Sequence, residues 1–330
     1  MSTQTLASQL SELSIKLVIY CWTPIYIIGI LGNLLNIITF SRRTLRDNAC
    51  SQYFIGMSIV QIILFNSLSL TKIITNISGY DLGQTVAILC KIRSYLFIFS
   101  LGLMRQFLCL ISIDRWIMST DNARIRKFSS VFAVRWLMIG SSVFWILYSI
   151  HILIGFQTIP TRGCTHLANP SYALFYVIQF TISSIIPFII MTMFSIFTLR
   201  NVRNHSRIRI ASQNTAPSST MQFNLPQNIR RRRYEMQLIK LSLLQVIFYV
   251  FFSTLGTYYL LYSVITNSSK KSSDQIAIDV FLNNIALLLI YTYSSLTFVL
   301  YTLASRTFRK EFLLTCSRMF KYLQNMFLID

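Results

Sequence analysis

The stretch CKIRSYLFIFSLGLMRQFLCLISIDRW, residues 90–116, decides the fold of this chain. Its centre is continuously apolar, a cysteine stands at one end, and the triplet Asp114-Arg115-Trp116 stands at the other. A helix rises about 1.5 Å per residue, so the interval from Cys90 to Arg115 would span roughly 37 Å, enough to cross a bilayer core and reach both interfaces. The stretch therefore predicts a transmembrane helix with a cysteine at one membrane surface and a charged pair at the other.

The composition of the whole chain is that of a polytopic membrane protein. Of its 330 residues, 54% are hydrophobic and only 12% are charged, whereas about a quarter of the residues in a soluble domain are charged. The apolar runs lack the alternation of barrel strands. We therefore predict an all-α membrane protein, a seven-transmembrane helix bundle with a short amphipathic eighth helix. The predicted membrane helices cover residues 17–40, 53–77, 90–116, 132–156, 172–199, 238–265 and 276–302.

Polar segments flank this bundle in the sequence. We predict that residues 1–15 are a short extracellular N-terminus, that residues 16–304 form the seven-helix domain, and that residues 305–330 form a cytoplasmic amphipathic helix and tail. The tail alternates aromatic and basic residues in the pattern of a helix that lies on a membrane surface. Cys316 within it is a candidate for lipidation by palmitate.

The net charge of +20 is unevenly distributed along the chain. If the apolar runs alternate in direction, most of the 30 Lys and Arg residues fall on one side of the membrane, and basic loops remain in the cytoplasm. We expect a multi-pass plasma-membrane protein with an extracellular N-terminus and a cytoplasmic C-terminus, and no binding of nucleic acid. The polar segment 200–233 should be flexible at its centre; its run Arg230 to Arg233 either orients the chain against anionic lipid or contacts a specific partner.

Several polar residues stand inside the predicted helices and need internal partners. These are Asn33, Gln61 and Arg105. Arg105 would lie about 15 Å deeper in the membrane than Arg115, with no acidic residue at a clearly matching depth, so Gln61, Tyr249 or water are its candidate partners. Lys72 is expected to extend toward the outer interface.

The cysteines and the proline inside a predicted membrane helix carry further expectations. Of the six cysteines, only Cys90 and Cys164 stand at predicted extracellular positions outside a helix core, which predicts one disulfide in an oxidising compartment. Pro187 interrupts the backbone hydrogen bonds of the fifth helix, so neighbouring groups must satisfy the carbonyl that it frees.

Over about residues 15–320 the chain resembles a divergent rhodopsin-like (class A) G-protein-coupled receptor. The interval from Cys90 to Arg115 matches the family's interval between an outer cysteine and the arginine of its Asp-Arg-Tyr triplet. Gly32-Asn33 resembles the signature of helix one, and Pro187 resembles the proline of helix five. The resemblance implies the same seven-helix fold and a disulfide between Cys90 and the loop that carries Cys164.

The resemblance also implies a switch at the cytoplasmic ends of the helices. Asp114 and Arg115 would form the family's resting pair, and Tyr301 looks like the tyrosine of Asn-Pro-x-x-Tyr. Glu235 is the acidic residue at the inner end of helix six, where many members pair a glutamate with the helix-three arginine. We predict that these four residues serve activation and G-protein coupling.

The chain departs from the family pattern in four helices. Ser195 stands where the family has a tyrosine low in helix five. Gln61 stands where the family has an aspartate that binds sodium, and Thr297-Phe298 replaces the Asn-Pro of helix seven. In helix six, Ser253 and Leu255 take the places of the family's tryptophan and proline. These substitutions predict unusual switch machinery.

The predicted ligand contacts lie in the outer half of the bundle, where aromatic residues also serve packing and the membrane interface. They are Phe97, Gln179, Tyr258, Tyr259, Tyr262 and Asn283. Phe97 stands where amine receptors of this family carry an aspartate, so an amine would find no counter-ion there. We therefore favour a neuropeptide over a monoamine.

These features predict a receptor that binds an extracellular ligand and activates a heterotrimeric G protein, without cofactor or metal. A polytopic transporter is the alternative; it would show inverted repeats and helices broken near the midplane, and no such repeat is seen in the sequence. An enzyme is not predicted, because His151, His166 and His205 are scattered and the membrane runs hold no acidic cluster.

Overall fold

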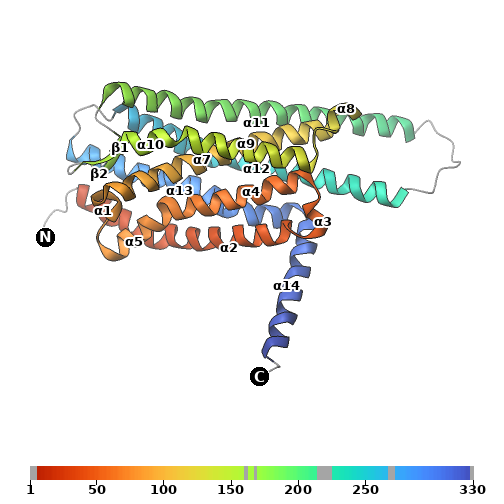
Figure 1. Cartoon of the computed structure of the whole chain (residues 1–330), viewed down its shortest axis with the longest axis horizontal. Helices are drawn as coiled ribbons and strands as arrows, with labels where there is room; N and C mark the ends of the chain where they lie inside the picture. The colour runs from red at the N-terminus through yellow and green to blue at the C-terminus, as the bar shows by residue number, and fades with distance from the viewer. Residues whose placement is uncertain (1–5, 160–162, 167–168, 214–224, 267–271, 328–330) are drawn as a thin grey trace.

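The computed structural model describes residues 6–159, 163–166, 169–213, 225–266 and 272–327. They form a bundle of long helices that run side by side (Figure 1). Within these ranges seven helices are long and apolar enough to cross a membrane: Leu6–Phe40, Ala49–Ser78, Ala87–Ser119, Val131–Gly155, Ser171–Asn204, Glu235–Thr254 and Ser273–Ala304. The predicted seven-helix bundle is confirmed.

The elements follow one another along the chain, and two membrane helices contain short π-helical turns, η1 and η2. In order they are α1 (Leu6–Leu17), η1 (Val18–Trp22), α2 (Thr23–Phe40), α3 (Arg43–Arg46), α4 (Ala49–Leu64), η2 (Phe65–Ser69), α5 (Leu70–Ser78), α6 (Leu82–Thr85), α7 (Ala87–Ser119), α8 (Ala123–Arg126), α9 (Val131–Tyr148), α10 (Ile150–Gly155), β1 (Phe156–Ile159), β2 (Gly163–His166), α11 (Pro170–Gln213), α12 (Leu225–Ile265), α13 (Ser273–Ala304) and α14 (Arg306–Phe327).

The first membrane helix begins earlier than the sequence predicts. It starts at Leu6, within the segment expected to be a polar N-terminus, and an ion pair of 2.7 Å between Lys16 Nζ and Glu12 Oε1 spans one turn of α1. The π turn η1 precedes Pro24, which has no N–H to donate to the preceding turn. The N–H and the hydroxyl of Thr23 both donate to the Val18 carbonyl, the hydroxyl over 3.2 Å.

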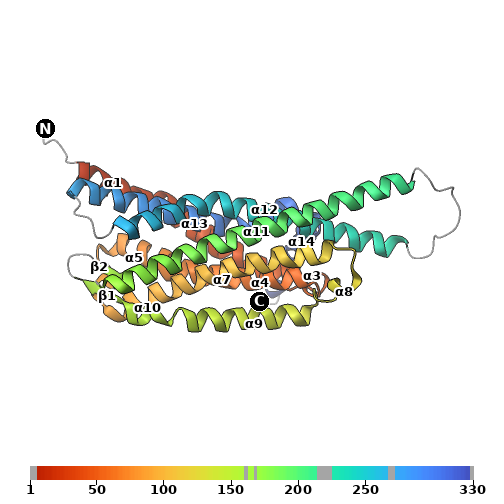
Figure 2. The same cartoon turned by 90° about the horizontal axis from the view of Figure 1, so that it is seen from above.

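Helices α11 and α12 also extend beyond their predicted ends. Figure 2 shows both projecting past the rest of the bundle. The polar segment expected from 200 to 233 is helical up to Gln213 and again from Leu225, and its expected flexible centre, residues 214–224, lies outside the described residues. The arginine run 230–233 is therefore carried on α12.

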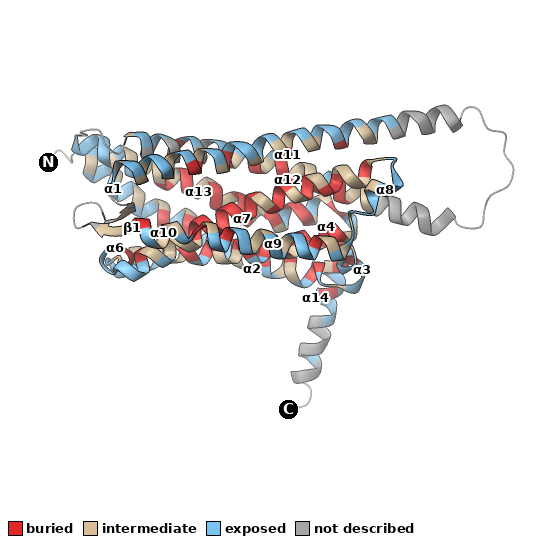
Figure 3. Cartoon of the chain, turned by 45° about the horizontal axis from the view of Figure 1, so that its top comes forward, coloured by how far each residue is buried: buried red, intermediate tan, exposed pale blue. Residues whose placement is uncertain are grey.

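Helix α7 is the buried axis of the bundle. It packs against α4, α9, α11 and α12, and its central turns are the most continuously buried part of the chain (Figure 3). The outer faces of α9 and α11 are apolar, with Phe132, Leu147 and Ile189 all more than half exposed. Apolar side chains on the outside of membrane-spanning helices face lipid.

A disulfide joins Cys90 on α7 to Cys164 on strand β2, with the two Cα atoms 5.5 Å apart. This bond confirms the predicted pairing. Strand β2 pairs antiparallel with β1, and Thr158 lies opposite Cys164. We call this end of the bundle the disulfide end, and the opposite end of α7 the Arg115 end.

Helix α14 is the predicted eighth helix, and it leaves the bundle at a steep angle at the Arg115 end (Figure 1). Phe308 anchors it: the side chain is buried, with its ring centroid 4.9 Å from that of Phe40. Glu311 lies 3.7 Å from Arg42 across the same junction. Cys316 is exposed on α14, and its lipidation stays a prediction.

Candidate functional site

A buried cluster of three charges joins α7 to α12 at the Arg115 end. The Arg115 guanidinium donates from Nη1 to Glu235 Oε2 over 3.0 Å and from Nε to Asp114 Oδ2 over 3.1 Å. Its Nη2 also donates to the Asp114 carboxylate. Arg115 and Asp114 are almost fully buried, whereas the Glu235 side chain is 18% exposed. Charge-assisted bonds of this kind are stronger than neutral ones, so the cluster holds the ends of the two helices together.

Both carboxylates of this cluster have a second partner that the sequence did not indicate. Asp114 Oδ1 accepts a hydrogen bond of 2.5 Å from the Ser129 hydroxyl, and Glu235 Oε1 accepts one of 3.1 Å from Asn48 Nδ2. Asn48 also caps α4 by accepting from the Cys50 amide. The loops before α4 and α9 are therefore attached to the same cluster.

Tyr301 links α13 to α12 farther into the bundle. Its hydroxyl accepts a hydrogen bond of 2.8 Å from Gln245 Nε2, and its ring packs against Phe40, Phe54 and Phe308. The predicted tyrosine is thus buried between the helix that carries Glu235 and the start of α14. Gln245 was not singled out in the sequence.

The predicted polar residues Asn33 and Gln61 face the interior, where neutral groups meet from four helices. Asn33 Nδ2 donates to the carbonyls of Gly29, over 2.8 Å, and Ser294, over 3.4 Å. The Thr297 hydroxyl donates to Gln61 Oε1 over 3.3 Å, and Gln61 Nε2 lies 3.9 Å from the Met104 sulfur. An amide therefore occupies the place where the family pattern has a sodium-binding carboxylate.

Arg105 satisfies the carbonyl that Pro187 frees. Pro187 has no N–H for the carbonyl four residues earlier, and Arg105 Nη1 donates to that Ser183 oxygen over 3.4 Å. Arg105 Nε donates to the Tyr249 hydroxyl over 2.9 Å, and the guanidinium lies 5.5 Å from the Phe180 ring centroid. Tyr249, one of the three candidate partners, is therefore a hydrogen-bond partner of Arg105. Among the described residues no carboxylate lies within ion-pair distance of Arg105.

The structure does not bring all six predicted ligand contacts together, because Tyr258 lies apart from the others. Phe97 and Gln179 are buried in the bundle, and Gln179 Oε1 has no hydrogen-bond partner within the described part of the chain. Tyr259 donates to the Asp279 carbonyl and packs against Tyr262, with ring centroids 5.9 Å apart. Tyr258 instead faces outward from α12 and lines a cavity that none of the other five reaches, and Asn283 is half-buried on α13.

The predicted outward orientation of Lys72, near the disulfide end, is wrong. Its ammonium group does not extend outward but turns toward α13, where it donates to Asn284 Oδ1. It also lies 5.1 Å from the Trp22 ring centroid. An amide oxygen and an aromatic face stabilise this cation, which forms no ion pair among the described residues. Asn284 is adjacent in the sequence to Asn283, a predicted ligand contact. That adjacency is the sequence feature from which Asn284 could have been found.

A second cavity, of about 240 Å³, opens near the disulfide end between α5, α6 and α7. Its wall includes Asn66, Thr71 and Tyr80 together with an ion pair of 3.0 Å between Arg93 and Asp81. The side chains around it offer one cation, one carboxylate, several hydroxyl groups and the Asn66 amide, and the rest of the wall is mostly apolar. Such a surface can bind the polar groups of a polypeptide.

Comparison with known proteins identifies two similarities. The family described as "7 transmembrane receptor (rhodopsin family)" matches residues 32–301. Human "Atypical chemokine receptor 4" is 24% identical over 197 residues, which cover 57% of this chain and 54% of that protein. The match thus spans about half the length of the relative.

Proposed function

Because this chain belongs to the rhodopsin family of seven-transmembrane receptors, we propose that it binds an extracellular polypeptide and activates a heterotrimeric G protein. The disulfide end faces the outside of the cell in this proposal, and α14 lies against the cytoplasmic leaflet. The distribution of Lys and Arg along the sequence supports that orientation.

The contact between Arg115 and Glu235 carries the proposal of G-protein coupling. It is an ion pair of 3.0 Å that joins the ends of two membrane helices, one of which, α12, continues beyond the bundle. If the end of α12 moved away from α7, Arg115 would lose this partner and become accessible to a protein that binds between the helices. A ligand that favours the separated state would shift the population toward it.

The charges at the disulfide end support a polypeptide ligand. Phe97 offers no counter-ion to an amine, and the charged groups near the disulfide end are of both signs, because Arg93 is paired with Asp81 and the Lys72 ammonium donates to Asn284. The name of the human relative describes a chemokine receptor, which also favours a polypeptide. Both a neuropeptide and a chemokine-like ligand fit this chemistry.

The test is a screen of the expressed full-length receptor with a sensor of G-protein dissociation. We expect a response to a member of a neuropeptide or chemokine library and none to a monoamine panel. Arg115→Ala should abolish the response at matched surface expression. Activation by a simple monoamine at micromolar concentration would contradict the ligand class, and substrate transport without any G-protein response would overturn the receptor function.

A further inference from the structure

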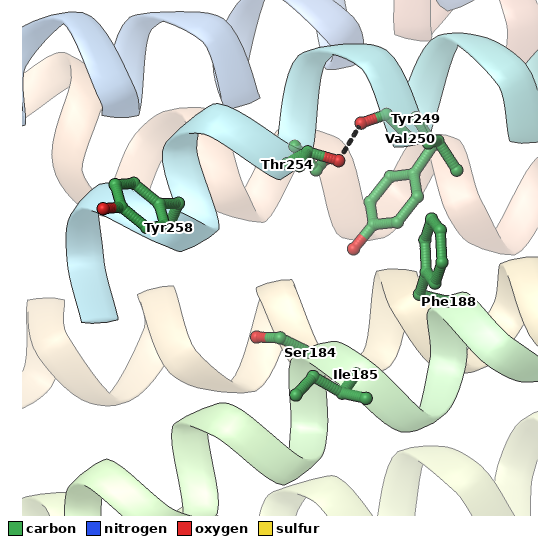
Figure 4. Close-up of a pocket in the computed structure, with 8 residues that line it drawn as sticks. Ser184, Ile185, Phe188, Tyr249, Val250, Thr254 and Tyr258 are labelled. Atoms are coloured by element: carbon green, nitrogen blue, oxygen red, sulfur yellow. Dashed lines mark hydrogen bonds between the residues drawn. The ribbon is translucent and has the colours of Figure 1, made fainter. Parts of the chain in front are cut away.

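A cavity of about 260 Å³ lies between α11 and α12 (Figure 4). Tyr249, which lines it, accepts a hydrogen bond from the buried Arg105. Ile185 and Phe188 line it from α11, and Tyr258 lines it from α12. These three side chains are between 41% and 70% exposed although they belong to helices of the bundle. The cavity therefore opens toward the hydrocarbon of the bilayer, and a molecule dissolved in the membrane could enter it.

Two buried residues that line this cavity, Tyr249 and Ser253, have a hydroxyl hydrogen to donate. The Tyr249 oxygen accepts from Arg105, and no described residue accepts the hydrogen of Tyr249. Ser253 is 5% exposed, and its hydroxyl has no hydrogen-bond partner among the described residues. The neighbouring hydroxyls of Ser184 and Thr254 differ, because each donates to a carbonyl of its own helix over 2.8 Å and 2.6 Å.

The charge of Arg105 lies directly behind Tyr249. The guanidinium has five N–H donors, and in the part of the chain that the structure describes it makes two hydrogen bonds and no ion pair. A charged side chain in the membrane normally pairs with an opposite charge or with water. An anion that accepted from Tyr249 would lie close to this guanidinium and would complement its charge.

We propose that this cavity binds a fatty acid that enters from the bilayer. Its carboxylate would accept hydrogen bonds from Tyr249 and Ser253, and its acyl chain would lie along Ile185, Phe188 and Tyr258. The single negative charge complements the Arg105 guanidinium, which forms no ion pair with any described residue, and the side chains of Ile185 and Phe188 and the ring of Tyr258 match a hydrocarbon chain. This site is separate from the surface at the disulfide end and does not depend on the proposed polypeptide ligand.

The probe is a long-chain fatty acid that carries a photoreactive diazirine in its chain and a terminal alkyne. The purified full-length receptor in nanodiscs should be labelled on the segments 184–188 and 249–258. Free palmitate should compete with this labelling, whereas hexadecanol, which has the same chain without the charge, should compete at least about tenfold more weakly.

Single substitutions assign the carboxylate contact. Tyr249→Phe keeps the ring that packs 5.4 Å from Tyr293 but removes the hydroxyl, and Ser253→Ala removes the unpartnered group. Each should weaken palmitate competition about tenfold, because a hydrogen bond to a charged group is lost. Thr254→Val is the matched control, since that hydroxyl is already satisfied by the Val250 carbonyl, and it should bind palmitate as the native receptor does.

The outcomes separate a specific site from a general lipid contact. Equal competition by palmitate and hexadecanol, or labelling that avoids both segments, would overturn the proposal. So would unchanged palmitate competition in both Tyr249→Phe and Ser253→Ala. If Tyr249→Phe does not fold, the comparison of Ser253→Ala with Thr254→Val decides the question. Because the readout is binding alone, its result does not depend on whether the receptor couples to a G protein.

Discussion

Replacing Glu235 with alanine should raise ligand-independent signalling. The substitution removes the carboxylate that accepts from Arg115 Nη1 over 3.0 Å and from Asn48 Nδ2 over 3.1 Å, so α12 loses its charged contact with α7. Arg115 keeps Asp114 as a counter-charge, and the variant is therefore not left with an isolated buried cation. The resting arrangement should weaken while the fold is maintained.

The burial of the pair sets the size of the effect. Arg115 is 2% exposed and Glu235 is 18% exposed, which places the pair between a surface ion pair and a buried one. A contribution of about 1–2 kcal/mol is typical of this range. Because about 1.4 kcal/mol changes a two-state ratio tenfold, a receptor that rests about 1% active would become roughly 9% active.

The assay is basal G-protein dissociation at matched surface expression. Glu235→Gln should give a smaller increase, since the amide oxygen can still accept from Asn48 but carries no charge. Glu12→Ala is the control: it removes an exposed carboxylate from an ion pair on α1 and should leave basal activity unchanged. If the agonist-responsive receptor shows the same basal signal with and without the Glu235 carboxylate, the contact does not stabilise the resting state.

Two further predictions concern folding. Cys90→Ser and Cys164→Ser should each lower surface expression, and the double variant should express no worse than either single one, because the two residues share one bond; additive losses would argue against it. Gly102→Ala should lower the free energy of unfolding by about 1–3 kcal/mol, because a Cβ there would lie 2.2 Å from the buried ring of Trp145. A lower melting temperature of the detergent-solubilised receptor would report this loss. Gly140→Ala should not lower the melting temperature, because no atom lies within 4 Å of the added Cβ. Equal melting temperatures of the two variants would contradict the packing argument.

The parts of the structure that depend on local composition could be predicted from the sequence. A long apolar run must form its backbone hydrogen bonds within itself in a membrane, so each helix could be located from its own residues. The pairing of Cys90 with Cys164 followed from their shared compartment and from the family spacing. Glu235 could be found by counting along one helix, because helical rise fixes its depth.

Contacts made by loops and by long flexible side chains could not be predicted in this way. Ser129 and Asn48 reach the charged cluster only because the turns before α9 and α4 place them there, and no periodicity encodes those turns. Lys72 has enough rotatable bonds to extend outward or inward, and the choice depends on Asn284, which is 212 positions away in the sequence. The early start of α1 at Leu6 was missed because its residues are not apolar enough to mark a membrane run.

Helices α7 and α12 are joined at two depths by arginines of α7, and this arrangement limits what the loss of Glu235 can do. Arg105 donates to Tyr249, and Arg115 donates to Glu235 about 15 Å away along α7. Between these depths Gln245 ties α12 to Tyr301 on α13. Glu235→Ala removes only the contact nearest the Arg115 end, so Tyr249 and Gln245 still hold the middle of α12 in place. This is why the expected rise in basal signalling is partial, and why the end of α12 should respond to the substitution more than its middle does.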